Sequence, residues 1–415
     1  MNYRKLFVVL VFVLAIFIRF YNFSDRITFG PEQAISLITS GKMIKEKFSL
    51  LGEENVQRVN SLGHRIYSGA LFTYSLMPIQ LLFSYNPILI TAYFSLLNIF
   101  IGVLLYKFAL EISNPGTAIF SVSIFLFSGM MIYHSLFIWN QNYIILLGLL
   151  TFYTLYKLTK RKKPIYALFL GLLSGTALSI EYYYLFTLLL VLFIALKLTK
   201  KKVATLMLFL VGITLPNMPA IIFDMRHNFY LSKTLIVYLS DVIHGSRTSS
   251  ISYYHFLQFA PITALFLGYV LHKIYLSRKG SAYILLIIFI YLNIRSPWID
   301  FKAPMGMPGD LSVKGIYKAA DMIAKDNPDN FNVVVLADFD TRGHVLRYPL
   351  EFSYNLTPKG VTDYSGAKSV YVLSKKSYDF DNPGVWELSS FLPYNESILT
   401  AIGREYALYK LSKQI

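Results

Sequence analysis

The chain has 415 residues, of which 55% are hydrophobic, 16% aromatic and only 15% charged, and its mean hydropathy is +0.50. One soluble core of this length cannot bury so much apolar surface, so the composition excludes an ordinary soluble protein and predicts a polytopic membrane protein. The net charge of +16 does not indicate a nucleic-acid partner, because the lysines cluster between apolar runs, and the absence of cysteine excludes disulfides and thiolate chemistry.

The first predicted element is an apolar run at residues 6–22. No small-residue cleavage site follows it, since the next residues read RFYNFSDR, and we therefore expect an uncleaved membrane anchor. Further apolar runs of spanning length are predicted at residues 87–106, 117–136, 143–158, 164–180, 183–198, 203–222, 255–276 and 280–294.

The apolar segment at residues 66–83 is predicted not to cross the membrane. Three strongly basic loops, at residues 157–163, 197–202 and 272–279, indicate the cytoplasmic side, and Arg4 and Lys5 place the N-terminus there too. If residues 66–83 crossed, the parity of crossings would put the N-terminus opposite those loops. We therefore expect nine spans in the plasma membrane, a cytoplasmic N-terminus and one extracytoplasmic loop at residues 23–86.

Within this loop, the sequence PEQAISLITSGKMIKEKF predicts a surface helix that begins at about Pro31. Glu32 then lies in the first helical turn, close to the membrane face, where the helix dipole favours a carboxylate. One interpretation is that Glu32 only stabilises the start of the helix. The other is that it belongs to a reaction site.

Polar and aromatic side chains also gather in the other segments predicted to lie outside. These segments are YHSLFIWNQNY at residues 133–143, IEYYY at residues 180–184 and LPNMPAIIFDMRHNF at residues 215–229. Tyrosine and tryptophan at headgroup depth often form only an interfacial belt. A carboxylate, an Arg–His pair and several amides on one side, however, indicate a site for a lipid phosphate and a sugar.

The ordered motifs resemble those of the polyprenyl-phosphate-dependent GT-C glycosyltransferases, which include protein O-mannosyltransferases and bacterial aminoarabinose transferases. The matching pieces are Glu32-Gln33 for an acidic DQ or DE pair, Leu51-Gly52, SGALFTYSLMP at residues 68–78, WNQN at residues 139–142 and LPNMPAIIFDMRHNF at residues 215–229. The resemblance covers about the first 295 residues. The chain departs from the pattern in having Glu32 where aspartate is usual and Gly69-Ala70 where Gly-Pro is usual.

The resemblance implies a mainly α-helical GT-C-like catalytic module at residues 1–295. It implies transfer of a hexosyl or pentosyl group from a polyprenyl-phosphate donor to an acceptor hydroxyl at the outer face, with the acceptor, whether lipid, glycan or protein, left open. Glu32 is the expected general base. The expected ligands of the donor phosphate are Arg226, His227, Arg65 and Lys233. The expected substrate contacts are Gln33, Trp139, Asn140, Asn142, Glu181 and Asp224.

Two other classes of function remain open at this point. A lipid-linked-sugar flippase or transporter would place polar groups in broken helices at mid-membrane and often contains internal repeats, which the two halves of this chain do not show convincingly. A catalytically silent GT-C-like binding protein would account for glutamate in place of aspartate. No cofactor is predicted, because no His, Asp and Glu cluster has metal-ligand spacing, although a divalent metal is left open.

Beyond Trp298 the composition becomes that of a soluble domain, and we expect a small extracytoplasmic α/β domain at residues 296–415. An amphipathic helix is predicted at residues 312–326 and a second helix from residue 342 to the residue before Pro349. Strands are predicted at residues 331–339, 369–376 and 405–411. No glycine-rich phosphate loop follows the first strand, so we interpret the domain as an acceptor-side or structural cap.

Overall fold

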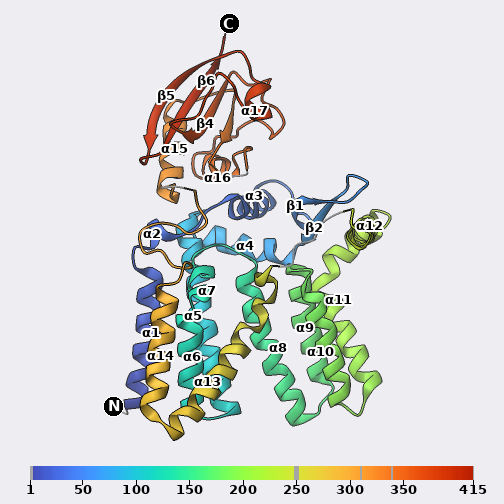
Figure 1. The fold of residues 1–415 in the computed structure, drawn as a ribbon. Helices are drawn as coiled ribbons and strands as arrows, with labels where there is room; N and C mark the ends of the chain where they lie inside the picture. Colours follow the sequence, from blue (N-terminus) through green and yellow to red (C-terminus); the bar gives the residue numbers. More distant parts are fainter. Residues whose placement is uncertain (1–2, 247–251, 309–310, 338–339, 415) are drawn as a thin grey trace.

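The protein consists of a layer of upright helices and an upper part that contains the first loop and the C-terminal residues (Figure 1). The computed structural model describes residues 3–246, 252–308, 311–337 and 340–414, without the side chains of residues 3–4 and 55–58. The two ends of the chain lie at opposite ends of the molecule.

The upright layer contains helical structure at each of the nine segments predicted to span the membrane, and the segment at residues 117–136 contains two helices, α6 and α7. These helices are α1 (Tyr3–Phe20), α5 (Pro87–Ile112), α6 (Pro115–Phe127), α7 (Gly129–His134), α8 (Gln141–Arg161), α9 (Ile165–Ile180), α10 (Tyr184–Leu198), α11 (Lys202–Arg226), α13 (Ala260–Ser277, after the 3₁₀ turn η1, Tyr253–Phe259) and α14 (Lys279–Ile294). Among the described residues, α5, α11 and the continuous η1–α13 stretch are long and apolar enough to cross a membrane by length and composition alone. The chain is therefore a polytopic membrane protein, as its composition predicts.

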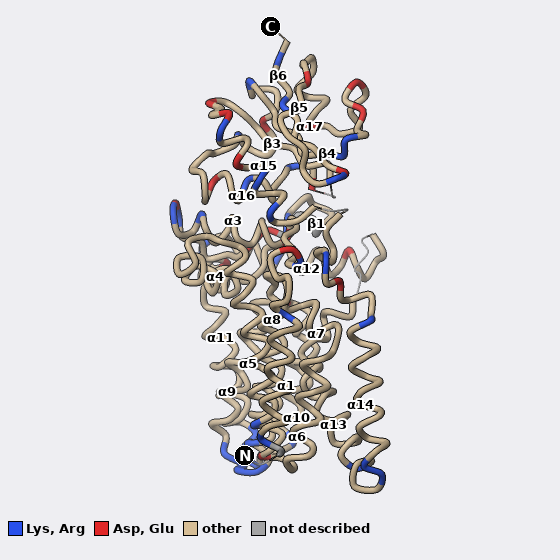
Figure 2. Tube along the Cα trace, turned by 90° about the vertical axis from the view of Figure 1, so that its left-hand side faces the viewer, with Lys and Arg blue, Asp and Glu red and all other residues tan. Residues whose placement is uncertain are grey.

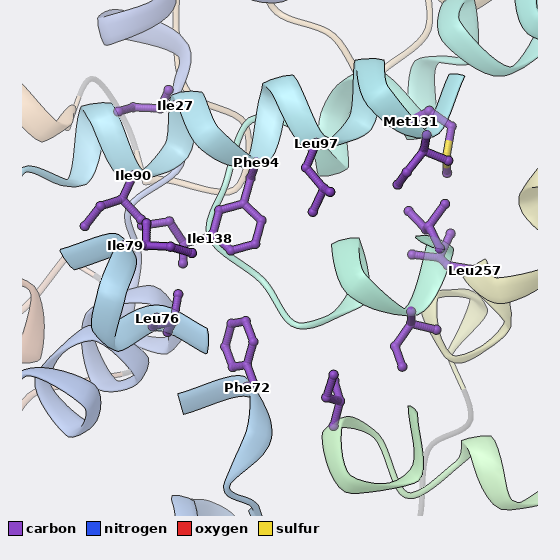
Figure 3. Packing of buried hydrophobic residues seen from close by; sticks show 14 of the residues in the cluster. Ile27, Phe72, Leu76, Ile79, Ile90, Phe94, Leu97, Met131, Ile138 and Leu257 are labelled. Atoms are coloured by element: carbon purple, nitrogen blue, oxygen red, sulfur yellow. The ribbon is translucent and has the colours of Figure 1, made fainter. Parts of the chain in front are cut away.

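Helix α4 (Leu71–Leu82) lies across the upper ends of the upright helices instead of beside them (Figure 1). Figure 3 shows Phe72, Leu76 and Ile79 of α4 packed close to Ile90 and Phe94 of α5. Burial of these side chains stabilises α4 in its place over the ends of the upright helices by about 1.5–3 kcal/mol for each fully buried residue. This orientation agrees with the prediction that residues 66–83 stay on one side of the membrane.

The first loop has regular secondary structure before α4. It contains α2 (Phe23–Arg26), α3 (Pro31–Lys45) and an antiparallel hairpin of β1 (Leu51–Val59) and β2 (Arg65–Gly69). Helix α3 begins at Pro31, as predicted, because proline needs no hydrogen-bond partner at the first helical position. The hairpin was not predicted, since its strands contain polar residues and lack a clear alternation.

The C-terminal residues form a small α/β unit. Its elements are α15 (Val313–Lys325), β3 (Phe331–Val335), α16 (His344–Ser353), β4 (Ser369–Lys375), α17 (Trp386–Ser389), β5 (Tyr394–Ile402) and β6 (Tyr406–Lys413). The sheet order is β3-β4-β6-β5, with β3 and β4 parallel and the other neighbours antiparallel. Strands β3 and β4 are almost wholly buried, which agrees with their predicted continuous apolar runs.

Two predicted bounds in this unit were wrong, and one strand was missed. Strand β3 ends at Val335, short of the predicted residue 339, and residues 338–339 lie outside the described part of the chain. Helix α16 continues through Pro349 to Ser353, because Leu350 and Phe352 are buried and their packing outweighs the backbone hydrogen bond that proline removes. Strand β5 was missed because it is an edge strand with mostly exposed side chains, which gives no apolar pattern.

Helix α16 attaches the C-terminal unit to the first loop. The hydroxyl of Tyr348 donates to Gln80 Oε1 at 3.1 Å and to the backbone oxygen of Tyr85 at 2.8 Å, both at the end of α4. Phe352 lies directly against Gly41 of α3, where an added Cβ would come within 2.4 Å of the ring. The unit is therefore packed on α3 and α4 and shares their buried hydrophobic cluster.

Basic side chains gather at the end of the helical layer that holds the N-terminus (Figure 2). The loops at residues 157–163, 197–202 and 272–279 join upright helices at this end, and α3, α4 and the C-terminal unit lie at the other. The positive-inside rule therefore continues to predict a cytoplasmic lower end and an extracytoplasmic upper end.

We expect a cysteine introduced at the exposed Leu82, at the end of α4, to react with a membrane-impermeant maleimide in intact cells. The matched control is Lys200→Cys in the α10–α11 loop, which should react only after permeabilisation. The chain has no native cysteine, so each label reports one position. Labelling of Leu82→Cys only from the cytoplasmic side would show that the predicted topology is wrong.

Candidate active site

A cavity of about 590 Å³ lies where the upright helices, the first loop and the C-terminal unit meet. Its wall includes residues of α3, β1 and β2, the ends of α8 and α9, and the turn η1. The remaining wall comes from the loop between β3 and α16, and from α17. The site is therefore assembled from segments that are more than 300 residues apart in the sequence.

Glu32 lies in this wall, at the second position of α3. Gln33 Oε1 accepts the backbone N–H of Gly30 at 2.9 Å and so satisfies a donor at the start of the helix. Glu32 itself has no hydrogen-bond or ion-pair partner among the described residues, and its side chain is exposed to the cavity. Protein surrounds the cavity, and this burial raises the pKa of the Glu32 carboxyl.

A raised pKa is the opposite of what a helix N-terminus alone produces. The helix dipole stabilises a carboxylate and lowers its pKa, whereas the raised pKa of Glu32 comes from the loss of solvent around it. Such a group is more typical of a reaction site than of a helix cap.

Glu53 of β1 is a second acid in the same wall. Ser36 of α3 donates its hydroxyl to Glu53 Oε2 at 2.5 Å. Burial raises the pKa of Glu53 to about 7, and the nearby charge of Glu32 adds to this effect, while the Ser36 hydrogen bond opposes it.

Glu181 lies in the wall where α9 ends. Gln141 Nε2 donates to Glu181 Oε2 at 2.7 Å, and the Nδ1 atom of His255 is 3.8 Å from Glu181 Oε1. The His255 ring is buried between Tyr183 and Tyr254, with ring centroids 3.9 and 4.3 Å away. The Glu181 carboxylate is thus held in place beside an imidazole that is shielded from water.

The C-terminal unit contributes a charged loop to the wall. Asp340 Oδ2 accepts the backbone N–H of His344 at 3.0 Å, and the Nδ1 atom of His344 is 2.8 Å away. Burial raises the pKa of Asp340, but the hydrogen bonds and charge of His344 and the charge of Arg342 lower it more. The pKa of Asp340 is therefore below its ordinary value. Nearby, Thr341 donates its hydroxyl to Glu387 at 2.6 Å.

The described lining is strongly acidic. Its carboxylates are Glu32, Glu53, Glu54, Glu181, Asp340 and Glu387, and its basic side chains are Arg342, His255 and His344. Arg342 is therefore the one permanently charged cation among the described lining residues. Within the described part of the chain its guanidinium makes no hydrogen bond or salt bridge, although its charge acts on Asp340, and it is half-buried, so it can contact an anionic ligand.

Four of the residues predicted as catalytic or substrate-binding come together in this cavity: Glu32, Trp139, Asn140 and Glu181. Asn140 donates to the backbone oxygen of Ile180 at 3.1 Å, and its Oδ1 atom is buried without a partner in the described structure. Asn140 is therefore fixed at the end of α9 through its amide nitrogen.

The other predicted substrate contacts lie elsewhere. Gln33 acts at the start of α3, and Asn142 is buried and donates to the backbone oxygens of His134 and Phe137. Asp224 accepts the backbone N–H groups of Leu231 and Ser232, and so caps the start of α12 (Tyr230–Ile243). Asp224 lines a smaller pocket of about 170 Å³, which adjoins the main cavity at Ile66 and Tyr182.

The four predicted phosphate ligands are not among the residues that line the main cavity. Arg226, His227 and Lys233 are exposed where α11 meets α12, and the His227 ring stacks on Phe223. Arg65 of β2 forms a salt bridge with Glu54, which does line the cavity. Arg65 therefore lies beside the main cavity, and Arg226, His227 and Lys233 lie near residues of the smaller pocket.

Sequence reasoning missed Glu53, His255 and the loop at residues 340–344. The acidic pair in LGEENV lay in the predicted outer loop and offered a usable signal for Glu53. His255 was assigned to the start of a span. The 340–344 loop gave no local signal, because only the folding of the C-terminal unit brings it to the cavity. Within the described residues, no group of three or more His, Asp and Glu side chains is arranged to hold a metal ion.

No protein-family profile matches this sequence, and no curated protein matches it either. Solved structures do match its fold. The chain is similar to ArnT from Cupriavidus metallidurans in the apo state, with a TM-score of 0.55, 11% identity and 97% of each chain covered. The ArnT structure with undecaprenyl phosphate gives a TM-score of 0.56, 12% identity and the same coverage.

The oligosaccharyltransferase AglB from Archaeoglobus fulgidus, in complex with an inhibitory peptide and a dolichol-phosphate, is also similar. Its TM-score is 0.50 at 11% identity, over 90% of this chain and 69% of that one. The likeness to ArnT extends over the C-terminal unit, beyond the 295 residues that the motifs covered. The chain therefore has the GT-C fold that the order of its motifs predicted.

Proposed function

We propose that the protein is a membrane glycosyltransferase that moves a sugar from a polyprenyl-phosphate donor to an acceptor hydroxyl in the main cavity. The fold supports this class, since ArnT was solved with undecaprenyl phosphate and AglB with dolichol-phosphate. The observation on which the proposal rests is the unpartnered Glu32 carboxyl, which faces a cavity at the end of the helical layer.

Glu32 is the proposed general base. A sugar linked to a lipid phosphate already has a leaving group, so the protein must position an acceptor hydroxyl and remove its proton. A carboxylate in a partly enclosed cavity is a stronger base than one in water, because burial disfavours its charge. Trp139 and Asn140 lie in the same wall and offer an aromatic side chain and a polar side chain to a sugar.

The leaving phosphate needs a cation near the base, and Arg342 meets this requirement in the cavity. Arg226, His227, Lys233 and Arg65 remain proposed contacts for the lipid headgroup, outside the main cavity instead of at the reacting centre. Under this proposal they contact the membrane-anchored donor before its phosphate reaches the cavity. Under this proposal the reaction takes place at the extracytoplasmic face of the plasma membrane.

We expect Glu32→Gln to lower turnover by about 10²–10⁴-fold, because glutamine has the same size but cannot accept the acceptor's proton. The measurement is release of polyprenyl phosphate from a labelled lipid-linked sugar by the purified protein. Glu46→Gln, at the exposed opposite end of the same helix, is the matched control and should retain full turnover.

If Glu32→Gln turns over as fast as the unaltered protein, Glu32 is only a charge at a helix start. Absence of turnover in the unaltered protein, together with transport of the intact lipid-linked sugar across a proteoliposome membrane, would instead support a flippase. Absence of both activities with retained donor binding would support a silent binding protein.

We expect Arg342→Ala to weaken binding of undecaprenyl phosphate by about 10–100-fold, the usual effect of losing a charge-assisted hydrogen bond in a partly enclosed site. Arg226→Ala should weaken it by no more than about fivefold, because Arg226 is exposed and its charge is screened. Both variants are measured in the same detergent at two salt concentrations. Equal affinities for Arg342→Ala and the unaltered protein would place the phosphate outside the cavity.

A further inference from the structure

Helix α12 has an exposed apolar face that the mechanism above does not use. Ile236, Leu239 and Ile243 follow one another at spacings of three and four residues, which places them on one side of the helix. Their exposed fractions are 66, 50 and 80%. Within the described part of the chain, no other element covers this face.

The opposite face of α12 is fixed to the turn of the hairpin at residues 60–64. Thr234 and Asp241 are buried on this face, two helical turns apart. Asp241 Oδ2 accepts the backbone N–H of Ser61 at 2.7 Å, and Asn60 Nδ2 donates to the backbone oxygen of Thr234 at 3.4 Å. These contacts set the rotation of α12 about its own axis, so its apolar face points away from the hairpin.

A third face of α12 is exposed and polar. It contains Lys233 and Ser240, which are also two turns apart, and His244 continues it just after the helix ends. Around the helix, this face lies between the apolar face and the buried one. A helix that lies in a membrane surface has this division, with apolar side chains toward the acyl chains and polar side chains toward water.

The position of α12 relative to α11 places it at the boundary of the bilayer. Helix α11 has 25 residues and is about 37 Å long at 1.5 Å per residue, so it extends beyond a hydrocarbon core of about 30 Å. Its exposed apolar side chains continue to Ile221 and Met225 in the last two turns, and Phe229 is exposed in the short connection to α12. Figure 1 shows α12 crossing the upper end of α11. The lipid-facing surface of α11 therefore continues onto the apolar face of α12.

The exposed permanent charges at this junction are positive. In residues 222–246, the two cations Arg226 and Lys233 are exposed. The two acids of the same segment, Asp224 and Asp241, are buried and accept backbone N–H groups. A surface that combines exposed apolar side chains with exposed cations is complementary to a leaflet that contains anionic phospholipids.

We propose that α12 is an interfacial helix whose apolar face lies among the acyl chains of the outer leaflet and whose neighbouring cations contact anionic phospholipid headgroups. The hairpin that is fixed to its inner face is thereby held at a set height above the bilayer. Glu54 and Ile66 of this hairpin line the main cavity, so the lipid contact also supports part of the cavity wall. The assignment goes beyond the proposed function and does not depend on sugar transfer.

The experiment compares single-cysteine variants that carry a bimane fluorophore, attached in detergent before reconstitution. The chain has no native cysteine, so each label reports one position. The variant is Leu239→Cys, and the matched control is the adjacent Ser240→Cys on the polar face. Each protein is placed as a single copy in a nanodisc of phosphatidylcholine and phosphatidylglycerol, which excludes contact with a second copy.

Two quenchers distinguish lipid from water. We expect a nitroxide on the lipid acyl chain to quench the label at position 239 at least about threefold more than the label at position 240, and aqueous iodide to show the reverse order. Ile243→Cys and His244→Cys repeat the comparison one turn later, in case Leu239→Cys does not fold.

The charge is tested with the same nitroxide attached either to phosphatidylglycerol or to phosphatidylcholine at equal mole fractions. We expect phosphatidylglycerol to quench the label at position 239 about two- to fivefold more strongly at low salt. Arg226→Ala combined with Lys233→Ala should remove this preference, and high salt should reduce it.

The proposal is supported if the apolar-face label is quenched from the lipid and the polar-face label from water. It is overturned if iodide reaches both labels equally, because α12 then lies in water. It is also overturned if neither quencher reaches position 239, because another part of the protein then covers the face. Equal quenching by the two labelled lipids would overturn the assignment of anionic headgroups. None of these outcomes requires turnover, so failure of the proposed function is a separate result.

Discussion

The buried amide of Gln80 joins the three elements on which the cavity depends. It donates to the backbone oxygen of Leu37 and to the hydroxyl of Ser40 on α3, and it accepts from Tyr348 on α16. Gln80 itself is on α4 and is fully buried. A buried amide that loses one of these partners costs about 1–3 kcal/mol, so the network favours a single arrangement of the three helices. That arrangement brings Glu32 and residues of the 340–344 segment into the wall of one cavity.

The proposed reaction site lies between the upright helices and the C-terminal unit. Helix α4 lies across the upper ends of part of the upright layer, and α3 lies between α4 and the C-terminal unit (Figure 1). Carboxylates that would be ordinary surface charges on a separate loop are thus partly removed from water, and burial raises the pKa of Glu32 and Glu53. The reactivity assigned to Glu32 therefore comes from tertiary packing more than from its place in α3.

Much of the fold was predictable because membrane helices leave strong local patterns. Apolar runs located the upright helices, loop charges gave the expected orientation, and Pro31 gave the start of α3. The hairpin and the edge strand β5 were missed because polar strands pair through the backbone and leave little apolar alternation. Helix α16 continues beyond Pro349 because burial of Phe352 outweighs the low helix propensity of proline.

Site residues were predictable only where a local sequence motif contains them. Glu32, Trp139, Asn140 and Glu181 were identified from the outer ends of predicted spans and do line one cavity. Arg226 and His227 lie in an equally suggestive motif, but the direction of α11 and α12 leaves them outside the main cavity. Arg342 could not be identified, because no local pattern indicates which loop of a C-terminal domain will face the membrane layer.

The most direct test is an experimental structure of the protein with undecaprenyl phosphate bound. The account predicts that the lipid phosphate lies in the main cavity, within hydrogen-bond distance of Arg342 and on the side of the wall that contains Glu32. A phosphate held instead by Arg226 and Lys233 beside the smaller pocket, with the main cavity closed to it, would contradict the assignment of the main cavity as the transfer site.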